Sequence, residues 1–145
     1  MIHFSQRDWR WSWKRIGTSF STIGQVGCTI TCLSMITGQR PDVTNTFLTK
    51  GGGYIYGNII NWTKLHDCLG LTFNTRMNGY DNLQVLNAIS QYGFCLVQVD
   101  AAPIGNPGGK HWVVFVGNHQ LLDPWTGTAR STSVYIPTGF CVISK

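Results

Sequence analysis

The chain has 145 residues, the size of a single domain, and 43% of them are hydrophobic, which is enough for one core. Charged residues make up 12% and the net charge is +5, so the composition excludes a disordered tail and a coiled coil. No apolar run reaches the roughly 18 residues of a membrane span, and the start, MIHFSQRDW, lacks the apolar stretch of a signal peptide. We therefore expect one domain over residues 1–145, without a membrane span.

The first feature in chain order is the N-terminal stretch at residues 7–15 (RDWRWSWKR), in which four cations are interleaved with three tryptophans. Such a stretch could form a surface for an anionic polymer such as nucleic acid, teichoic acid or lipid headgroups. The simpler interpretation, which we favour, is an arm whose rings pack on the domain while its cations stay in water. No nucleic-acid partner is expected.

Three later stretches show helical periodicity, and a glycine, which commonly ends a helix, follows each of them. We expect helices over 28–37, 58–69 and 81–92. In the second stretch, for example, Ile59, Trp62 and Leu65 recur at helical spacing.

The last third of the chain changes to short runs rich in β-branched and aromatic residues, which are typical of strands. We expect strands over 94–100 (FCLVQVD) and 111–117 (HWVVFVG), a third that ends at Asp123, and a fourth over 139–144 (GFCVIS). Helices first and strands afterwards predict an α+β domain, in which N-terminal helices pack on a C-terminal antiparallel sheet.

The five cysteines are an odd number and lie scattered in apolar runs, where cysteine usually behaves as a small buried hydrophobic residue. A disulfide framework is therefore not expected. Cys28 and Cys32 lie four apart on the first predicted helix, but no His or Cys pair at short spacing completes a tetrahedral metal site. We expect no metal and no other cofactor.

Cys28 is the candidate nucleophile because it follows Gly27 and begins the first predicted helix. A helix N-terminus carries a partial positive charge and free N–H groups, both of which favour a thiolate over a thiol. The backbone N–H of a residue in this position can also bind the oxyanion that forms when a carbonyl is attacked. Gly27 leaves room for a substrate to approach.

His111 and Asp123 are the candidate base and the candidate orienting acid. His111 begins the most apolar strand, and a neutral imidazole there can take the proton of a thiol. If a tight turn at Gly117-Asn118 pairs this strand with the next one, Asp123 lies near His111 and can hold the imidazole in the right tautomer. Pro124 then ends the strand.

Each of these three residues also has a simpler structural interpretation. A cysteine at a helix start and a histidine on an apolar strand are, taken singly, more often packing residues than catalytic ones. An aspartate before a proline is usually a turn former. The catalytic interpretation depends on all three lying at the ends of elements, in the order Cys, His, Asp, where all of them can line one cleft.

The motifs FSQRDW, STIGQVGCTITCLSMI, KHWVVFVG and LLDPWTG span nearly the whole chain. Together they resemble the papain-like cysteine peptidases related to bacteriocin leader (double-glycine) peptidases. The resemblance implies a papain-like fold with Cys28 as nucleophile, His111 as base and Asp123 as orienting acid. It also implies that Gln6 is the oxyanion donor, a role that suits an amide because it adds no charge to the site. Without the resemblance, the simplest interpretation of Gln6 is an exposed polar residue.

The chain departs from that family in two ways. It lacks the membrane spans and the Walker-type glycine loop of the transporters to which leader peptidases usually belong. In addition, Thr-Ile-Thr follows Cys28, where relatives commonly have Gly-Pro-Thr. We therefore expect a small free-standing form, located in the cytoplasm or carried in a phage virion.

The sequence thus predicts a cysteine peptidase that cleaves peptide or isopeptide bonds of a protein or peptide substrate through an acyl-enzyme thioester. Two alternatives stay open. One is an amidase or endopeptidase that cuts peptidoglycan with the same residues, which the cationic, tryptophan-rich start slightly favours. The other is a binding or virion protein that has kept the fold without the activity.

Overall fold

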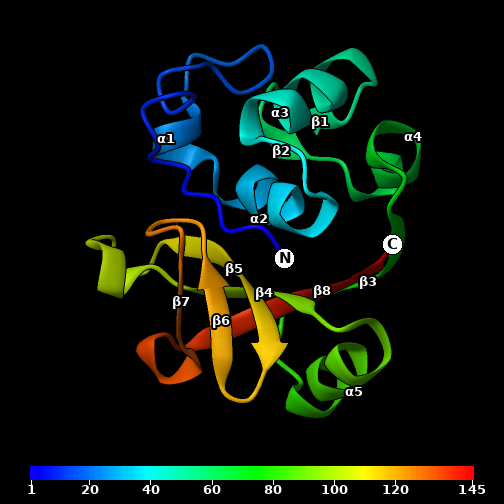
Figure 1. The fold of residues 1–145 in the computed structure, drawn as a ribbon, viewed down its shortest axis with the longest axis vertical. Coiled ribbons are helices and arrows are strands. Elements are labelled where there is room, and N and C mark those ends of the chain that lie inside the picture. The colour runs from blue at the N-terminus through cyan, green and yellow to red at the C-terminus, as the bar shows by residue number, and fades with distance from the viewer.

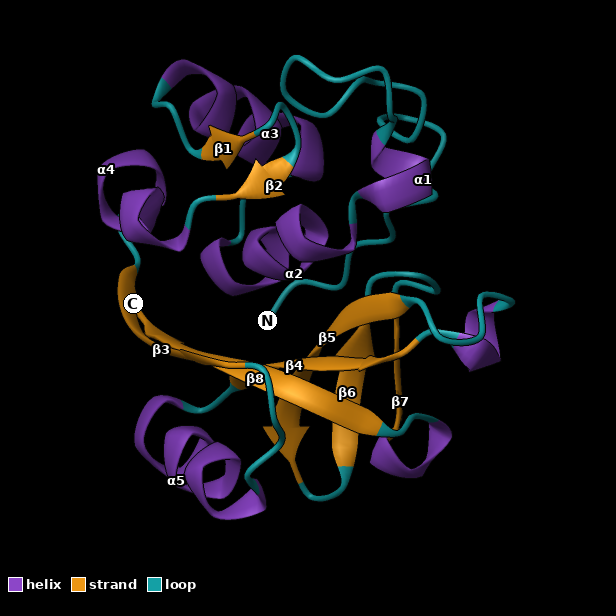
Figure 2. Cartoon of the chain, turned by 180° about the vertical axis from the view of Figure 1, so that it is seen from behind, coloured by secondary structure: helices purple, strands orange, loops and turns teal.

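Five helices and an antiparallel sheet of six strands divide between two halves of the molecule in the computed structural model, which describes residues 1–145 (Figures 1 and 2). Four helices gather in one half, and the fifth packs against the far face of the sheet in the other. None of them combines the length and the hydrophobicity needed to cross a membrane. The helices are α1 (Ile23–Val26), α2 (Cys28–Thr37), α3 (Pro41–Lys50), α4 (Leu65–Leu69) and α5 (Asn82–Tyr92).

The sheet has the strand order β3-β8-β4-β5-β6-β7, and every neighbouring pair is antiparallel. A separate hairpin in the helical half pairs strands β1 and β2. The predicted α+β class, with helices packed on an antiparallel sheet, is therefore confirmed. The strands are β1 (Tyr54–Ile55), β2 (Ile59–Ile60), β3 (Thr72–Met77), β4 (Cys95–Asp100), β5 (Lys110–Gly117), β6 (Gln120–Asp123), β7 (Thr128–Ser131) and β8 (Pro137–Ser144).

Two hydrophobic cores lie on opposite faces of the sheet. The larger contains 19 buried residues between the helical half and the sheet, and α2 lies at its centre because residues 30–36 are all buried. The smaller contains 10 buried residues between the sheet and α5. Strand β4 serves both cores, since successive side chains point to opposite faces: Leu96 belongs to the larger core and Val97 to the smaller.

Two of the three predicted helices are confirmed. Helix α2 covers residues 28–37 as predicted. Helix α5 begins one residue later than predicted because Asp81 is its N-cap. The Asp81 side chain accepts hydrogen bonds from the backbone N–H groups of Leu83 and Gln84.

The predicted helix over 58–69 is wrong in its first half. The hairpin β1–β2 closes through a turn in which Tyr56 and Gly57 have positive φ, and a 3-10 turn follows at Trp62–Lys64. Only the residues of α4 are α-helical. The apolar spacing fits a helix, but pairing of the two short strands replaces helical hydrogen bonds at the start of this stretch.

The four predicted strands are present and end at the predicted residues, but three of them begin one or two residues away from the predicted start. Strand β4 begins at Cys95, one residue late, while β5 begins at Lys110, one residue early, and β8 at Pro137, two residues early. Helices α1 and α3 and strands β3 and β7 were not predicted. Because β3 precedes α5, the chain does not place all of its helices before its strands, which corrects the predicted order.

The turn between β5 and β6 lies one residue later than predicted. Gly117 pairs with Gln120, so the two turn residues are Asn118 and His119. Both have positive φ, 53° and 56°, which a type I′ hairpin turn requires. The pairing nevertheless extends to Val114 and Leu122, so that Asp123, the next residue of β6, lies within reach of His111.

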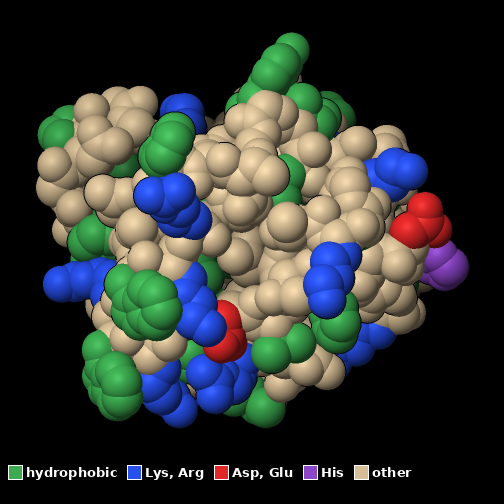
Figure 3. Space-filling model, turned by 90° about the horizontal axis from the view of Figure 1, so that it is seen from above, with side chains coloured by type: hydrophobic (Ala, Val, Ile, Leu, Met, Phe, Trp, Pro, Cys, Tyr) green, Lys and Arg blue, Asp and Glu red, His purple; other side chains and the backbone are tan.

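The N-terminal stretch packs on the domain only in part. Trp11 is fully buried, and its Nε1 donates a hydrogen bond to the Ser5 carbonyl at 2.7 Å. Trp9 and Trp13 are 80% and 68% exposed. The expected packing of the rings therefore holds for Trp11 and is wrong for the other two. Figure 3 shows Lys and Arg side chains gathered beside hydrophobic ones on one part of the surface.

Candidate active site

Cys28 follows a junction between two helices that the local sequence fixes closely. Helix α1 begins with a capping box, in which Thr22 and Gln25 each bind the other's backbone N–H through the side chain. Gly27 ends α1 and caps α2. A Cβ added to Gly27 would come within 2.4 Å of the Ile23 carbonyl oxygen, so only glycine fits. Cys28 thereby becomes the first residue of α2.

This position gives Cys28 the electrostatic environment of a helix N-terminus. The first residues of a helix have no intrahelical acceptor for their N–H groups, so the N–H of Cys28 is free for an outside group. The positive end of the helix dipole favours the thiolate. The half-buried side chain lines a cavity of about 250 Å³ together with His111 and Gln6.

His111 reaches the same cavity from the start of β5. The residue is 2% exposed, and its Nε2 lies 2.9 Å from Oδ1 of Asp123, the last residue of β6. His111 also lies close enough to the Cys28 thiol to lower the pKa of that thiol, and the two side chains line the same cavity. Because Nε2 is engaged by Asp123, Nδ1 is the ring nitrogen left to exchange a proton with Cys28.

Asp123 is fully buried and accepts hydrogen bonds from three further groups. The backbone N–H of Trp125 donates to Oδ1 at 2.9 Å. Arg130 Nη1, at 3.0 Å, and the Tyr135 hydroxyl, at 2.5 Å, both donate to Oδ2. Sequence reasoning missed Arg130 and Tyr135, which bind the carboxylate oxygen that His111 does not.

The charges of these residues stabilise one another. Burial opposes ionisation of Cys28, but the contact with His111 and the backbone N–H of Trp112 hold the pKa of the thiol below its ordinary value. Burial also disfavours the charged form of His111, but Asp123 and Cys28 together raise its pKa to about 9. Despite burial, the hydrogen bonds from His111 and Tyr135 lower the pKa of Asp123 to about 2. Both shifts, the lowered pKa of Cys28 and the raised pKa of His111, favour the thiolate–imidazolium pair over the neutral thiol and imidazole.

Gln6 is buried, at 2% exposure, rather than exposed. Its backbone N–H donates to the Pro124 carbonyl at 2.7 Å, and its Nε2 donates to the Gly24 carbonyl at 3.2 Å. Nε2 carries a second proton that this bond does not use, and the side chain lines the cavity beside Cys28. Gln6 therefore lies at the same cavity as Cys28 with one amide N–H unused, while its Oε1 is buried without a hydrogen-bond partner.

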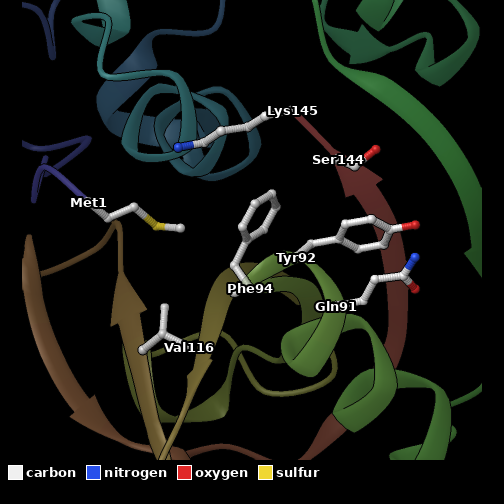
Figure 4. A pocket seen from close by; sticks show the side chains of 8 residues that line it. Met1, Gln91, Tyr92, Phe94, Val116, Ser144 and Lys145 are labelled. Atoms are coloured by element: carbon white, nitrogen blue, oxygen red, sulfur yellow. The ribbon is translucent and has the colours of Figure 1, made fainter.

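The cavity with these groups is not the largest in the molecule. A cavity of about 580 Å³ lies between the chain ends, where Met1 and Lys145 approach Phe94 (Figure 4). No Cys, His or Asp side chain lines that larger cavity, so the larger cavity is not the one that holds the candidate catalytic residues. The wall of the Cys28 cavity includes Trp125, whose ring lies under the Arg7 guanidinium at 4.5 Å.

The other four cysteines lack the environment of Cys28, although all five are free thiols. Burial raises the pKa of Cys32 and Cys141, and raises that of Cys95 to about 12. Cys68 is half-buried, and its pKa is also raised. No group of three or more His, Cys, Asp or Glu side chains has the arrangement of a metal site.

Three of the four site residues predicted from the sequence, Gln6, Cys28 and His111, therefore line one cavity, and the fourth, Asp123, binds the His111 ring without lining it. A thiolate, an imidazole, a carboxylate and an amide in this arrangement can supply a nucleophile, a proton carrier, its orienting group and an oxyanion donor. Comparison of the chain with protein-family models, with curated proteins and with solved structures finds no match in any of the three.

Proposed function

We propose that the chain is a cysteine peptidase that hydrolyses peptide or isopeptide bonds, a small free-standing relative of the bacteriocin leader peptidases with a papain-like fold. The observation that carries this proposal is the placement of the buried His111 ring, which lines one cavity with Cys28 and binds Asp123 through Nε2 at 2.9 Å. The buried amide of Gln6 at the same cavity supports it.

In the proposed reaction, the Cys28 thiolate attacks the carbonyl carbon of the scissile amide, and the C=O electron pair moves onto the oxygen. The N–H of Cys28 and Nε2 of Gln6 donate hydrogen bonds to this oxyanion. When the tetrahedral intermediate collapses, the C–N bond breaks and His111 gives its proton to the leaving amine. Neutral His111 then deprotonates a water, whose oxygen attacks the thioester, and the C–S bond breaks to restore the thiolate and the imidazolium.

A peptidoglycan amidase or endopeptidase is the second candidate, with the same residues acting on a different amide. The N-terminal stretch favours it, because cations such as Lys14 can bind the anionic wall of a bacterial cell. The rings of Trp9 and Trp13 in the same stretch are exposed and free to contact that wall. Zymography on purified walls separates the two candidates, since only the second predicts clearing of the wall layer.

The decisive test is digestion of a mixed peptide library, read by mass spectrometry. We expect Cys28→Ala to lower the rate by on the order of a thousandfold or more, and the matched control Cys68→Ala to leave it unchanged. Full hydrolysis by Cys28→Ala rejects the proposal. A wild-type chain that cleaves neither peptides nor walls, and whose thiols all react slowly and equally with iodoacetamide, indicates a binding or virion protein instead.

A further inference from the structure

A second cavity, of about 380 Å³, adjoins the candidate active site. It shares Val26 with the Cys28 cavity. Thr29 and Trp112, which follow Cys28 and His111 in the chain, also line it. A peptide bound with its scissile bond at Cys28 therefore has this cavity within reach of a neighbouring side chain.

Arg76, on β3, is the only charged side chain that lines this second cavity. Its guanidinium stacks on the Trp112 ring, 4.8 Å from the centroid. It donates hydrogen bonds to the Met77 carbonyl and, at 3.4 Å, to Oε1 of Gln98. Gly139 on the neighbouring strand β8 leaves space for it, since a Cβ there would lie 3.2 Å from Nη1. These contacts fix the guanidinium in one orientation.

The charge of Arg76 is not balanced by a carboxylate, because none of the ion pairs in the structure includes it. A guanidinium has five N–H donors, and only two hydrogen bonds are made here. All six acidic residues of the chain are aspartates, and each is engaged elsewhere. Asp8 pairs with Arg10, and Asp42 with Lys14 and Arg40. Asp67 lies 3.9 Å from Nδ1 of His66, Asp81 caps α5, Asp100 accepts from the Ala102 N–H, and Asp123 binds His111.

From these observations we infer that the second cavity binds a carboxylate of the substrate through Arg76, and so selects peptides with an acidic group near the scissile bond. A carboxylate can accept two parallel hydrogen bonds from one guanidinium. The rings of Trp62 and Trp112, which meet edge to face at 5.5 Å, supply an apolar wall for the methylene groups of an acidic side chain. The inference rests on the proposed function, because it names the substrate class of the same site.

The carboxylate can come from a Glu or Asp side chain or from a free C-terminus, and peptide pairs distinguish these sources. One set of quenched fluorescent peptides differs only by Glu or Gln at successive positions on either side of the scissile bond. A second set ends in a free acid or an amide after the bond. We expect the wild type to cleave the favoured acidic peptide with a kcat/KM about tenfold above its neutral partner, and this ratio to fall as salt is added.

The variants are Arg76→Gln, Arg76→Lys and a matched control, Arg15→Gln. Arg15 also stacks on an aromatic ring, with its guanidinium 4.8 Å from the Phe20 centroid, but it lines neither cavity. We expect Arg76→Gln to lose the preference, Arg76→Lys to keep part of it, and Arg15→Gln to keep all of it together with the wild-type rate on the neutral peptide. An equal loss in Arg15→Gln, or no preference in the wild type, overturns the inference.

Binding to the Cys28→Ala variant separates failure of this inference from failure of the proposed function. We expect that variant to bind the acidic peptide about tenfold more tightly than the neutral one, and the added Arg76→Gln change to remove the difference. Binding with this preference but without Cys28-dependent cleavage rejects the peptidase and keeps the carboxylate site. Cleavage that depends on Cys28 but shows no charge preference rejects the carboxylate site and keeps the peptidase.

Discussion

Asp123 is the residue on which the charges of the candidate site depend. A fully buried carboxylate without partners would be neutral, because the cost of removing its charge from water exceeds the cost of protonation. The donors around it, from His111 to Arg130 and Tyr135, keep it ionised. The ionised carboxylate raises the pKa of His111 in turn, and the imidazolium that results lowers the pKa of Cys28.

Asp123→Asn should therefore change protonation at Cys28 without removing the hydrogen bond that orients the ring. Asparagine offers His111 Nε2 an acceptor but no charge, so the pKa of His111 falls from about 9 and that of Cys28 rises. We expect the alkaline limb of the kcat/KM profile to move to lower pH. Labelling of Cys28 by iodoacetamide near neutral pH should slow by roughly tenfold, which corresponds to one pKa unit.

Asp100→Asn is the matched control for this change. The Asp100 side chain accepts a hydrogen bond from the Ala102 N–H at 2.8 Å and does not line the Cys28 cavity. Neither the pH profile nor the labelling rate should change. Equal profiles for wild type and Asp123→Asn would contradict the role assigned to the carboxylate.

The sequence points to only part of this residue network. Cys28, His111 and Asp123 can be selected because each lies at the end of a predicted element, and Gln6 only through the family resemblance. Arg130 would follow from the register of β6 and β7, in which Thr128 lies opposite Asp123 and Arg130 is two residues further on the same face. Tyr135 lies beyond β7, and no spacing rule places it at the carboxylate.

At the scale of elements, the α1–α2 junction decides where the thiol lies. Gly27→Ala should shift the first turn of α2, because the new Cβ would meet the Ile23 carbonyl at 2.4 Å. We expect a loss of about 1–3 kcal/mol in the free energy of unfolding and a larger fractional loss of Cys28-dependent hydrolysis. The measurements are denaturant unfolding and peptide cleavage.

Gly79→Ala is the matched control for the junction, since a Cβ there meets nothing within 4 Å. Its unfolding free energy and activity should match the wild type. A stable and fully active Gly27→Ala would show that the thiol does not depend on this close contact.

Elements with strong local signals were predictable, and those that depend on distant partners were not. Helices α2 and α5 carry apolar runs and terminal glycines, and α5 also has an N-cap at Asp81. Helix α3 buries only Pro41, Thr44 and Leu48, too few apolar positions for a clear period. Strand β3 pairs only with the last strand, β8, so its hydrogen bonds depend on residues far along the chain.

At the scale of the whole molecule, the residues before α1 connect the two halves. Gln6 donates its backbone N–H to Pro124, just after β6, while Ser12 and Lys14 accept hydrogen bonds from Gly24 and Ile23 in α1. Trp11 fills the larger core between these contacts. The cavity with Cys28 and His111 thus needs this part of the chain in place.

Trp11→Ala should destabilise the molecule by about 3–5 kcal/mol, because it removes a fully buried ring and leaves a cavity. Trp9→Ala, with a ring that is 80% exposed, should change the unfolding free energy by about 0.5 kcal/mol or less. Denaturant unfolding compares the two variants. Equally small changes in the free energy of unfolding for the two variants would mean that the N-terminal stretch contributes no core contact.

With Cys28 as thiolate and His111 as imidazolium, Arg130 completes a group of four charges whose sum is zero, since Asp123 carries a carboxylate and Arg130 a guanidinium. In the proposed reaction, acylation neutralises the sulfur and the imidazole together, so the sum stays at zero. The site therefore never has to hold an uncompensated ion, and the surroundings need little rearrangement as the proton moves.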